Sequence, residues 1–201
     1  MIFLTGPHCA GKTTVAEILT LYNFQYIDLG PVLRSKHQKD SPKISFHEWI
    51  LLKEKQNGKH FTDNLLVEHI NKYIKKLIKN HILVRDLIIC GNRSFQGIQY
   101  ITKNTIKPYP YERNIIIWID ADPQILWKRF CAQRKPISFQ NFKELLKKDE
   151  RIGIRTIKKK ADYIIFNNYH NIKYLKKEVS KFFFEQLNPS RELGLFNKKL
   201  F

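Results

Sequence analysis

The chain reads Gly6-Pro7-His8-Cys9-Ala10-Gly11-Lys12-Thr13 close to its first residue, and this octet matches the pattern G-x-x-x-x-G-K-[ST]. The apolar run at 2–5 before it is typical of a buried strand, and Val15, Ile18 and Leu19 after it recur at helical spacing. A strand, a glycine-rich loop and a helix in this order are the setting in which the pattern forms a phosphate-binding P-loop. Backbone N–H groups of such a loop and the start of its helix cradle phosphate groups. The octet therefore predicts a binding site for a nucleoside triphosphate.

The loop residues carry the predicted nucleotide contacts. Lys12 is expected to reach the β- and γ-phosphates of ATP, and the Thr13 hydroxyl to hold Mg²⁺, so ATP and Mg²⁺ are the expected cofactors. His8 occupies one of the freely variable positions of the loop. We assign nucleotide binding to the loop residues and the threonine that follows: Gly6, Cys9, Ala10, Gly11, Lys12, Thr13 and Thr14.

Length and composition indicate one α/β domain with a small insert in a chain of 201 residues. No run of eighteen apolar residues predicts a membrane span, and the first residues enter a strand directly, which leaves no room for a signal peptide. Cys9, Cys90 and Cys131 are odd in number and far apart in the sequence, which favours the cytoplasm or another reducing compartment, such as the nucleus or an organelle matrix. None has a second Cys or a His at zinc-site spacing, so no structural metal is expected.

The formal net charge of +18 has two explanations that the sequence leaves open. A basic surface attracts the phosphates of nucleic acids, so RNA or a ribonucleoprotein is a candidate partner. The chain is also rich in Lys, Ile and Asn, whose codons are rich in A and T, and compositional drift raises the Lys content without any partner.

Strand and helix patterns alternate along the chain and predict a parallel sheet covered on both faces, the three-layer α/β sandwich of P-loop NTPases. Helical patterns occur at 46–52 and 65–78, with Gly58 between them as a C-cap, and Asp122-Pro123 begins a further helix that ends near Gln133. The five predicted strands are 2–5, 24–28, 87–90, 114–119 and 163–166, and the last helix is 172–187.

The organisation that follows is one domain at 1–187 and a basic C-terminal tail at 188–201. Within the domain, 30–82 forms a helical acceptor-binding insert, and the polar, basic segment 135–160 forms a lid. We expect the lid to be mobile without ligand and to close when both substrates bind, because its like charges repel until phosphates arrive.

Three further stretches carry a resemblance to the nucleoside and nucleotide kinases of the P-loop class. The stretch 27–34, Ile-Asp-Leu-Gly-Pro-Val-Leu-Arg, resembles the G-D-x-x-R and D-A-D-x-x-x-R elements of nucleoside monophosphate kinases and dephospho-CoA kinases. Gly91-Asn92-Arg93-Ser94 resembles their D-G-x-R stretch, and 161–167, Ala-Asp-Tyr-Ile-Ile-Phe-Asn, resembles the A-D-Y-x-I-x-N strand of dephospho-CoA-kinase-like proteins. The overall pattern is most similar to an archaeal branch of that group.

The resemblance implies roles for several side chains near predicted strand ends, where open α/β sheets bind their ligands. Arg34 and Arg93 would grip a phosphate of the acceptor, and Asn167 would lie beside the bound nucleotide. Arg129 and Arg134 lie on the helix that enters the lid, and two more arginines lie on the segment that leaves it. One or two of these four would fold over the donor phosphates: Arg129, Arg134, Arg151 and Arg155.

The acidic group of the site is the open question, because many relatives carry Asp where Cys90 stands and a thiol is a poor Mg²⁺ ligand. Asp28 is one candidate for this role, as base or as metal-shell acid. Alternatively, the metal rests on Thr13, phosphates and water, or catalysis is weak or absent. The expected catalytic residues are thus Lys12, Asp28, Arg93 and Arg129, and the acceptor ligands Asp28, Arg34 and Arg93.

Two functions fit these observations. One is an enzyme that moves the γ-phosphoryl group of ATP to a nucleoside or deoxynucleoside monophosphate or to dephospho-CoA. The other is a nucleotide-gated P-loop protein that binds RNA or a ribonucleoprotein with weak or no kinase activity.

Overall fold

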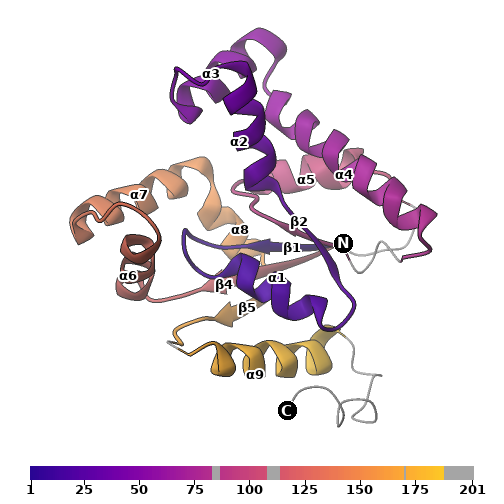
Figure 1. Cartoon of the computed structure of the whole chain (residues 1–201), viewed down its shortest axis with the longest axis vertical. Helices are drawn as coiled ribbons and strands as arrows, with labels where there is room; N and C mark the ends of the chain where they lie inside the picture. Colours follow the sequence, from indigo (N-terminus) through magenta and orange to yellow (C-terminus); the bar gives the residue numbers. More distant parts are fainter. Residues whose placement is uncertain (83–86, 108–113, 170, 188–201) are drawn as a thin grey trace.

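Five short strands form one parallel sheet, as predicted. The computed structural model describes residues 1–82, 87–107, 114–169 and 171–187. The strand order is β2-β3-β1-β4-β5, and every pairing is parallel (Figure 1). Strands with apolar residues on both faces are typical of a parallel sheet between helical layers. The strands are β1 (Ile2–Thr5), β2 (Gln25–Asp28), β3 (Leu87–Cys90), β4 (Ile115–Asp120) and β5 (Tyr163–Phe166).

Helices cover both faces of this sheet and complete the three layers. Leu4 and Ile88 face one apolar core, which includes residues of α1 (Lys12–Thr20), α6 (Pro123–Gln133) and α9 (Ile172–Phe182). Phe3 and Ile89 face the other core, which includes residues of α4 (Phe61–Lys79), α5 (Phe95–Asn104) and α8 (Ile154–Lys160). Burial of these side chains is the main favourable contribution to the stability of the domain.

The insert after β2 has three helices rather than the two expected helical stretches. They are α2 (Leu29–Asp40), α3 (Phe46–Asn57) and α4, and α2 is the helix that the sequence did not predict. Its weak pattern has a simple cause, since Leu29 is its only buried residue. Trp49 is fully buried in the insert, with ring centroids 5.8 Å from Phe46 and 6.1 Å from Phe61. Gly58 caps α3 with a φ of 92°, as predicted.

The segment predicted as a lid contains α7 (Phe139–Ile152) and α8. Phe142 of α7 is buried against Phe130 of α6, with 5.4 Å between ring centroids, so α6 and α7 pack as a pair. Ile154 and Ile157 of α8 lie in the sheet core. The part of 135–160 that projects from the sheet is therefore α7 and the turn before it, whereas α8 belongs to the body of the domain.

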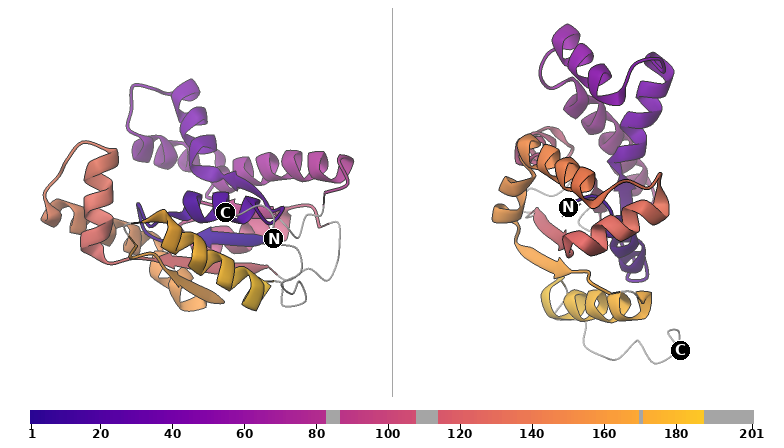
Figure 2. Two further views of the ribbon diagram at one scale, coloured as in Figure 1. Left: turned by 60° about the horizontal axis from the view of Figure 1, so that its bottom comes forward. Right: turned by 90° about the vertical axis from the view of Figure 1, so that its left-hand side faces the viewer.

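The α2–α3 part of the insert and the α6–α7 pair project from the domain as two lobes (Figure 2), whereas α4 packs on the sheet. Within the described ranges no helix is both long and apolar enough to cross a membrane. The predicted tail, 188–201, lies outside the described residues.

Candidate functional site

The predicted P-loop follows β1 and is held between the ends of β4 and β5. Gly6 has a φ of 147°, and a Cβ added there would lie 2.2 Å from the Ile119 carbonyl oxygen. Gly11 has a φ of 94°, and its Cβ would lie 2.4 Å from Nδ2 of Asn167. That amide donates a hydrogen bond of 2.8 Å to the Ala10 carbonyl. Both glycines are thus required by close packing, and Asn167 contacts the loop directly.

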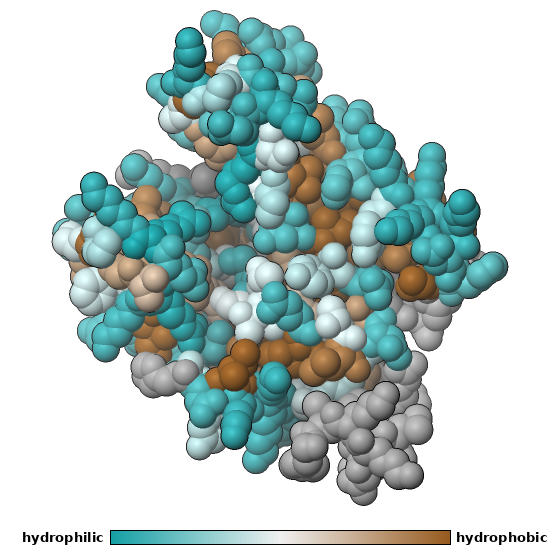
Figure 3. Space-filling model, in the orientation of Figure 1, coloured by the Kyte–Doolittle hydropathy of each residue, from teal (hydrophilic) through white to brown (hydrophobic). Residues whose placement is uncertain are grey.

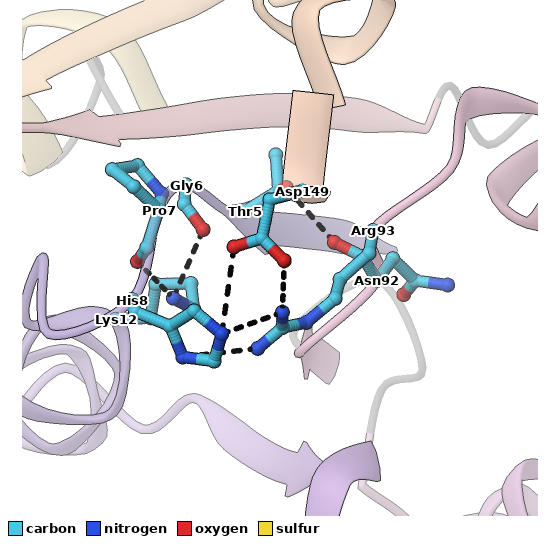
Figure 4. Close-up of polar contacts among 8 residues, drawn as sticks. All are labelled: Thr5, Gly6, Pro7, His8, Lys12, Asn92, Arg93 and Asp149. Carbon is cyan, nitrogen blue, oxygen red and sulfur yellow. Dashed lines mark hydrogen bonds and ion pairs between the residues drawn. The ribbon is translucent and has the colours of Figure 1, made fainter. Parts of the chain in front are cut away.

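Lys12 lies over the loop at the start of α1. Its ammonium group donates to the Gly6 carbonyl at 3.0 Å and to the Pro7 carbonyl at 2.7 Å (Figure 4). Burial, and secondly the positive charge of Arg93, lower the pKa of Lys12 to about 8. A lysine whose charge is disfavoured in this way gains most from an anionic ligand. The hydroxyl residue Thr13 follows at an exposed position, and Thr14 is half-buried.

Arg93 connects the P-loop to α7. Its NH1 group donates to Oδ1 of Asp149 at 2.5 Å and lies 2.8 Å from Nε2 of His8, and its NH2 group lies 3.2 Å from Nδ1 of His8 (Figure 4). Asp149 is 5 % exposed, and Oδ2 of its carboxylate lies 3.4 Å from Nε2 of His8. Three elements far apart in the sequence therefore meet at one guanidinium group.

Positive charges gather around His8. Burial is the largest cause that lowers the pKa of His8, to about 3, and the charges of Arg93, Lys12, Arg134 and Arg34 lower it further, in this order. The imidazole is therefore neutral at pH 7. Four cations close enough to act on one ring form a site for a ligand with several negative charges.

The predicted acceptor residues Asp28 and Arg34 lie at the start of α2. Oδ1 of Asp28 accepts a hydrogen bond of 2.9 Å from the Gly30 backbone N–H, so this carboxylate caps the helix. The Arg34 guanidinium reaches the same place, since a Cβ on Gly30 would lie 3.0 Å from its NH1 and 3.3 Å from Oδ1 of Asp28. Within the described part of the chain Arg34 has no ion-pair partner, which leaves its charge available for a ligand.

Cys90 lies beside Asp28 in the sheet. It is 1 % exposed, and burial together with the charge of Asp28 raises the pKa of its thiol to about 12. A thiol that stays protonated at neutral pH offers no anionic ligand to a cation. Where the resemblance to P-loop kinases implies an acidic group, this chain therefore has a neutral thiol.

Arg129 contacts the strand end that holds the P-loop. Its NH2 group donates to the Tyr169 carbonyl at 2.8 Å and to Oδ1 of Asn167 at 3.4 Å. Its NH1 group is buried and has no hydrogen-bond partner among the described residues. A buried donor without a partner is unfavourable and is typical of a site that a ligand completes. Arg155 instead forms a surface ion pair with Glu150 at 2.8 Å, and the Arg151 side chain lies outside the described residues.

Two residues of this site, His8 and Asp149, are not predicted from the sequence. His8 had no distinguishing signal, because the P-loop pattern accepts any residue there. Asp149 had a weak one, since it is an acidic residue within a strongly basic segment. In the space-filling view the surface is hollowed between the insert and the α6–α7 pair (Figure 3). The residues at 6–12 lie at the end of the sheet that faces this hollow (Figure 1).

The sheet order, the loop and the helical layers define a P-loop protein with a kinase-like α/β fold. The chain belongs to the AAA_18 family, described as an AAA domain, whose family model matches residues 2–145. The predicted resemblance to P-loop kinases is confirmed at the level of the fold.

Curated relatives cover nearly the whole chain. A UPF0200 protein of Thermococcus sibiricus is 25% identical over 181 residues, which cover 88% of this chain and 90% of that protein. A UPF0200 protein of Pyrobaculum aerophilum is 23% identical over 190 residues, which cover 92% of this chain and 97% of that protein. The expected likeness to an archaeal branch is thus confirmed.

Solved structures show the same fold at low sequence identity. A shikimate kinase from Acinetobacter baumannii in complex with shikimate has a TM-score of 0.54 and 19% identity, and the match covers 96% of this chain and 94% of that one. A dephospho-CoA kinase from Campylobacter jejuni has a TM-score of 0.52 and 20% identity, with coverage of 90% and 93%. These likenesses support the fold and do not define a substrate.

Proposed function

We propose that the protein is an ATP-dependent phosphotransferase that moves the γ-phosphoryl group to a phosphate-bearing, nucleotide-like acceptor. The observation that carries this proposal is the group of four cations around His8, which come from the P-loop, the insert, the end of β3 and the end of α6. A donor triphosphate alone would need the P-loop and Lys12. Arg34 and Arg93 supply charge on the acceptor side, where a second phosphate would bind.

Arg93 has the geometry that a phosphate clamp requires. Its NH1 and NH2 groups face His8, and NH1 also donates to Asp149. The Nε–H and the second hydrogen of NH2 have no partner among the described residues. These two donors lie on one edge of the planar group, and an arginine edge of this kind binds phosphate in a bidentate manner.

The residues present fit a Mg²⁺ ion that is held mainly by its nucleotide. No three His, Cys, Asp or Glu side chains gather as a metal site in the residues that the structure describes. Mg²⁺ needs no such cage, because it keeps several waters and binds through phosphates and one or two protein oxygens. The Thr13 hydroxyl would supply the protein oxygen, and Asp28 is the candidate for the outer shell. When bound, the ion would neutralise charge on the transferring phosphates.

The test is a panel of nucleoside monophosphates, deoxynucleoside monophosphates and dephospho-CoA, each assayed for ADP release with Mg-ATP. We expect one acceptor to be productive, and the Arg34→Ala variant to raise its KM by about 10-fold through loss of one phosphate contact. Lys36→Ala is the matched control, because Lys36 of the same helix forms a surface ion pair with Asp40 at 2.7 Å. If no acceptor in the panel raises the rate of ADP release above the rate measured without acceptor, the proposal is contradicted.

A nucleotide-gated RNA-binding protein is the second candidate. Two observations favour this function. The thiol of Cys90 is protonated, whereas the resemblance to P-loop kinases implies a carboxylate at this position, and the net charge of the chain is +18. Its test is a salt titration of RNA affinity with and without Mg-ATP. An affinity that falls steeply with salt and changes with nucleotide would support this function over phosphoryl transfer.

A further inference from the structure

We propose that Asp149 is a positioning residue: it orients the Arg93 guanidinium for an acceptor phosphate and couples this orientation to the docking of α7 on the P-loop. The inference rests on the proposed function, because it takes a phosphate as the group that Arg93 meets.

Burial singles out Asp149 among the acidic residues. It is the only buried carboxylate in the described part of the chain. Burial of an ionised carboxylate is strongly unfavourable unless a partner compensates it. The compensating partner is Arg93, whose NH1 group lies 2.5 Å from Oδ1, with Lys12 as a further nearby positive charge. A buried carboxylate charge at the end of a projecting helix is energetically unfavourable, which indicates a role for Asp149 beyond packing.

The geometry indicates orientation rather than competition for the ligand. Asp149 takes only one of the five N–H donors of Arg93, and His8 faces the two that point along the end of the guanidinium. The carboxylate and the imidazole together fix the plane of the group. Its remaining edge, Nε–H and NH2, is left for a bidentate anion. The side chain of Arg93 is 40 % exposed, so a ligand can reach the residue from solvent.

His8 completes the arrangement. A neutral imidazole has one donor and one acceptor nitrogen. The shortest contact, 2.8 Å between NH1 of Arg93 and Nε2 of His8, makes Nε2 the acceptor, because a guanidinium nitrogen only donates, and Oδ2 of Asp149 lies 3.4 Å from the same ring nitrogen. A residue of the P-loop, one of the β3 end and one of α7 then form a single network. The position of α7 and the orientation of the phosphate clamp therefore depend on each other.

The first arm of the test needs no turnover. Phenylglyoxal modifies arginine side chains, and mass spectrometry measures its rate at Arg93 in the ligand-free protein. We expect Asp149→Asn to raise this rate by about 10-fold, because the Arg93 guanidinium loses its charge-assisted bond to the carboxylate. The hydrogen exchange of the α7 amides should also rise by about 10-fold, because the same bond holds α7 against Arg93. Glu144→Gln is the matched control on the same helix, since Glu144 pairs with Lys147 at an exposed position. Rates at Arg93 and in α7 that stay at the parent values in Asp149→Asn would overturn the proposal.

The second arm uses the acceptor found in the panel. Asp149→Asn should raise the KM for this acceptor by about 10-fold and change kcat by less than about 3-fold, because Arg93 would bind the phosphate in a poorer orientation. Asp149→Glu, which keeps the charge, should recover part of the loss. In an Arg93→Ala background, Asp149→Asn should add nothing.

The two arms separate the failures. A large fall in kcat with unchanged KM, or an additive effect in the Arg93→Ala background, would mean that Asp149 does not act through Arg93 and would overturn the proposal. If no acceptor is turned over, the proposed function fails, whereas the first arm still decides whether Asp149 holds Arg93 and α7 in place.

Discussion

Asp28 and Cys90 are direct neighbours across the β2–β3 pair, at the carboxyl ends of both strands. Asp28 accepts the Gly30 N–H through Oδ1, and its charge helps to raise the pKa of the Cys90 thiol. The pair therefore presents one carboxylate and one neutral thiol. The helix cap explains why a side chain with an acceptor oxygen stands at position 28. The cap does not require the negative charge of Asp28, because Asn caps a helix equally well.

The Asp28→Asn variant separates these two roles. Asn caps helices as well as Asp does, so the free energy of unfolding should change by less than about 0.5 kcal/mol. If Asp28 is the acidic group of phosphoryl transfer, turnover should fall by roughly 10²-fold or more. Steady-state kinetics and urea unfolding measure the two effects. Unchanged turnover in a stable variant would exclude Asp28 from the reaction and favour a metal held by Thr13, phosphates and water.

A carboxylate in place of Cys90 should be costly in the absence of ligand. Cys90→Asp would bury a second negative charge beside Asp28, with the charge of Lys12 as partial compensation. We expect the free energy of unfolding to fall by about 2–4 kcal/mol without nucleotide. Mg-ATP should restore more of the melting temperature in this variant than in the parent, because the ion supplies a counter-charge. Equal stabilisation of both proteins by Mg-ATP would show that position 90 does not face the metal.

The sequence predicts the sheet well because each strand is a short apolar run that must be buried on both faces. The strand at 87–90 agrees with β3 at both ends, and the helix that begins at Asp122-Pro123 ends at Gln133 as predicted. The same criterion fails for α2, which packs few apolar residues and depends on the cap by Asp28. The polar and basic composition of 135–160 also predicts that Ile154 and Ile157 belong to a lid, although both are core residues of α8.

The site is predictable only where a residue contacts the phosphates through a local pattern. Lys12 and Gly11 belong to such a pattern, and Asn167 and Arg93 follow from resemblance at strand ends. Asp149 joins the site through the packing of α7, about 140 residues after the loop that it faces. Contacts of this kind depend on tertiary structure, and no periodicity or motif in one sequence encodes them.

His8 should make stability fall at acidic pH. Its folded-state pKa of about 3 lies below the ordinary value of 6.5, so the unfolded chain binds the proton first as the pH falls. The loss begins near pH 6.5 and continues toward pH 3, at about 1.4 kcal/mol per pH unit. Asp149 contributes in the opposite direction, because its pKa is raised by burial.

Comparison with His8→Gln isolates this effect, since the variant keeps Asp149. Between pH 7 and pH 5 the parent protein should lose about 2 kcal/mol more of its free energy of unfolding than the variant does. Urea unfolding at both pH values measures the difference. Parallel losses in the two proteins would indicate that His8 is protonated in the folded state.

Lys12 is the next residue to test by truncation. Lys12→Ala removes the ammonium group that donates to the Gly6 and Pro7 carbonyls, and turnover should fall by at least about 10²-fold because charge that grows on the phosphates is no longer neutralised. Stability should be retained, since burial already disfavours this charge in the folded protein. Lys147→Ala, an exposed lysine of α7, is the control for a simple loss of net charge. Turnover at the parent rate in Lys12→Ala would place the donor site elsewhere.

Gly11 and Gly153 form a matched pair that tests how the P-loop is held. Both have a left-handed φ, of 94° and 106°, so an alanine at either position introduces backbone strain of about 1–2 kcal/mol. A Cβ at Gly153 would meet nothing within 4 Å, whereas one at Gly11 would lie 2.4 Å from Nδ2 of Asn167. Gly11→Ala must therefore also displace the amide that donates to the Ala10 carbonyl.

We expect Gly153→Ala to lower only stability, and Gly11→Ala to lower stability further and to weaken ATP binding by about 10-fold or more through loss of loop geometry. Calorimetric titration with ATP and urea unfolding of both variants measure this, and equal ATP affinities would mean that the contact with Asn167 does not shape the phosphate site.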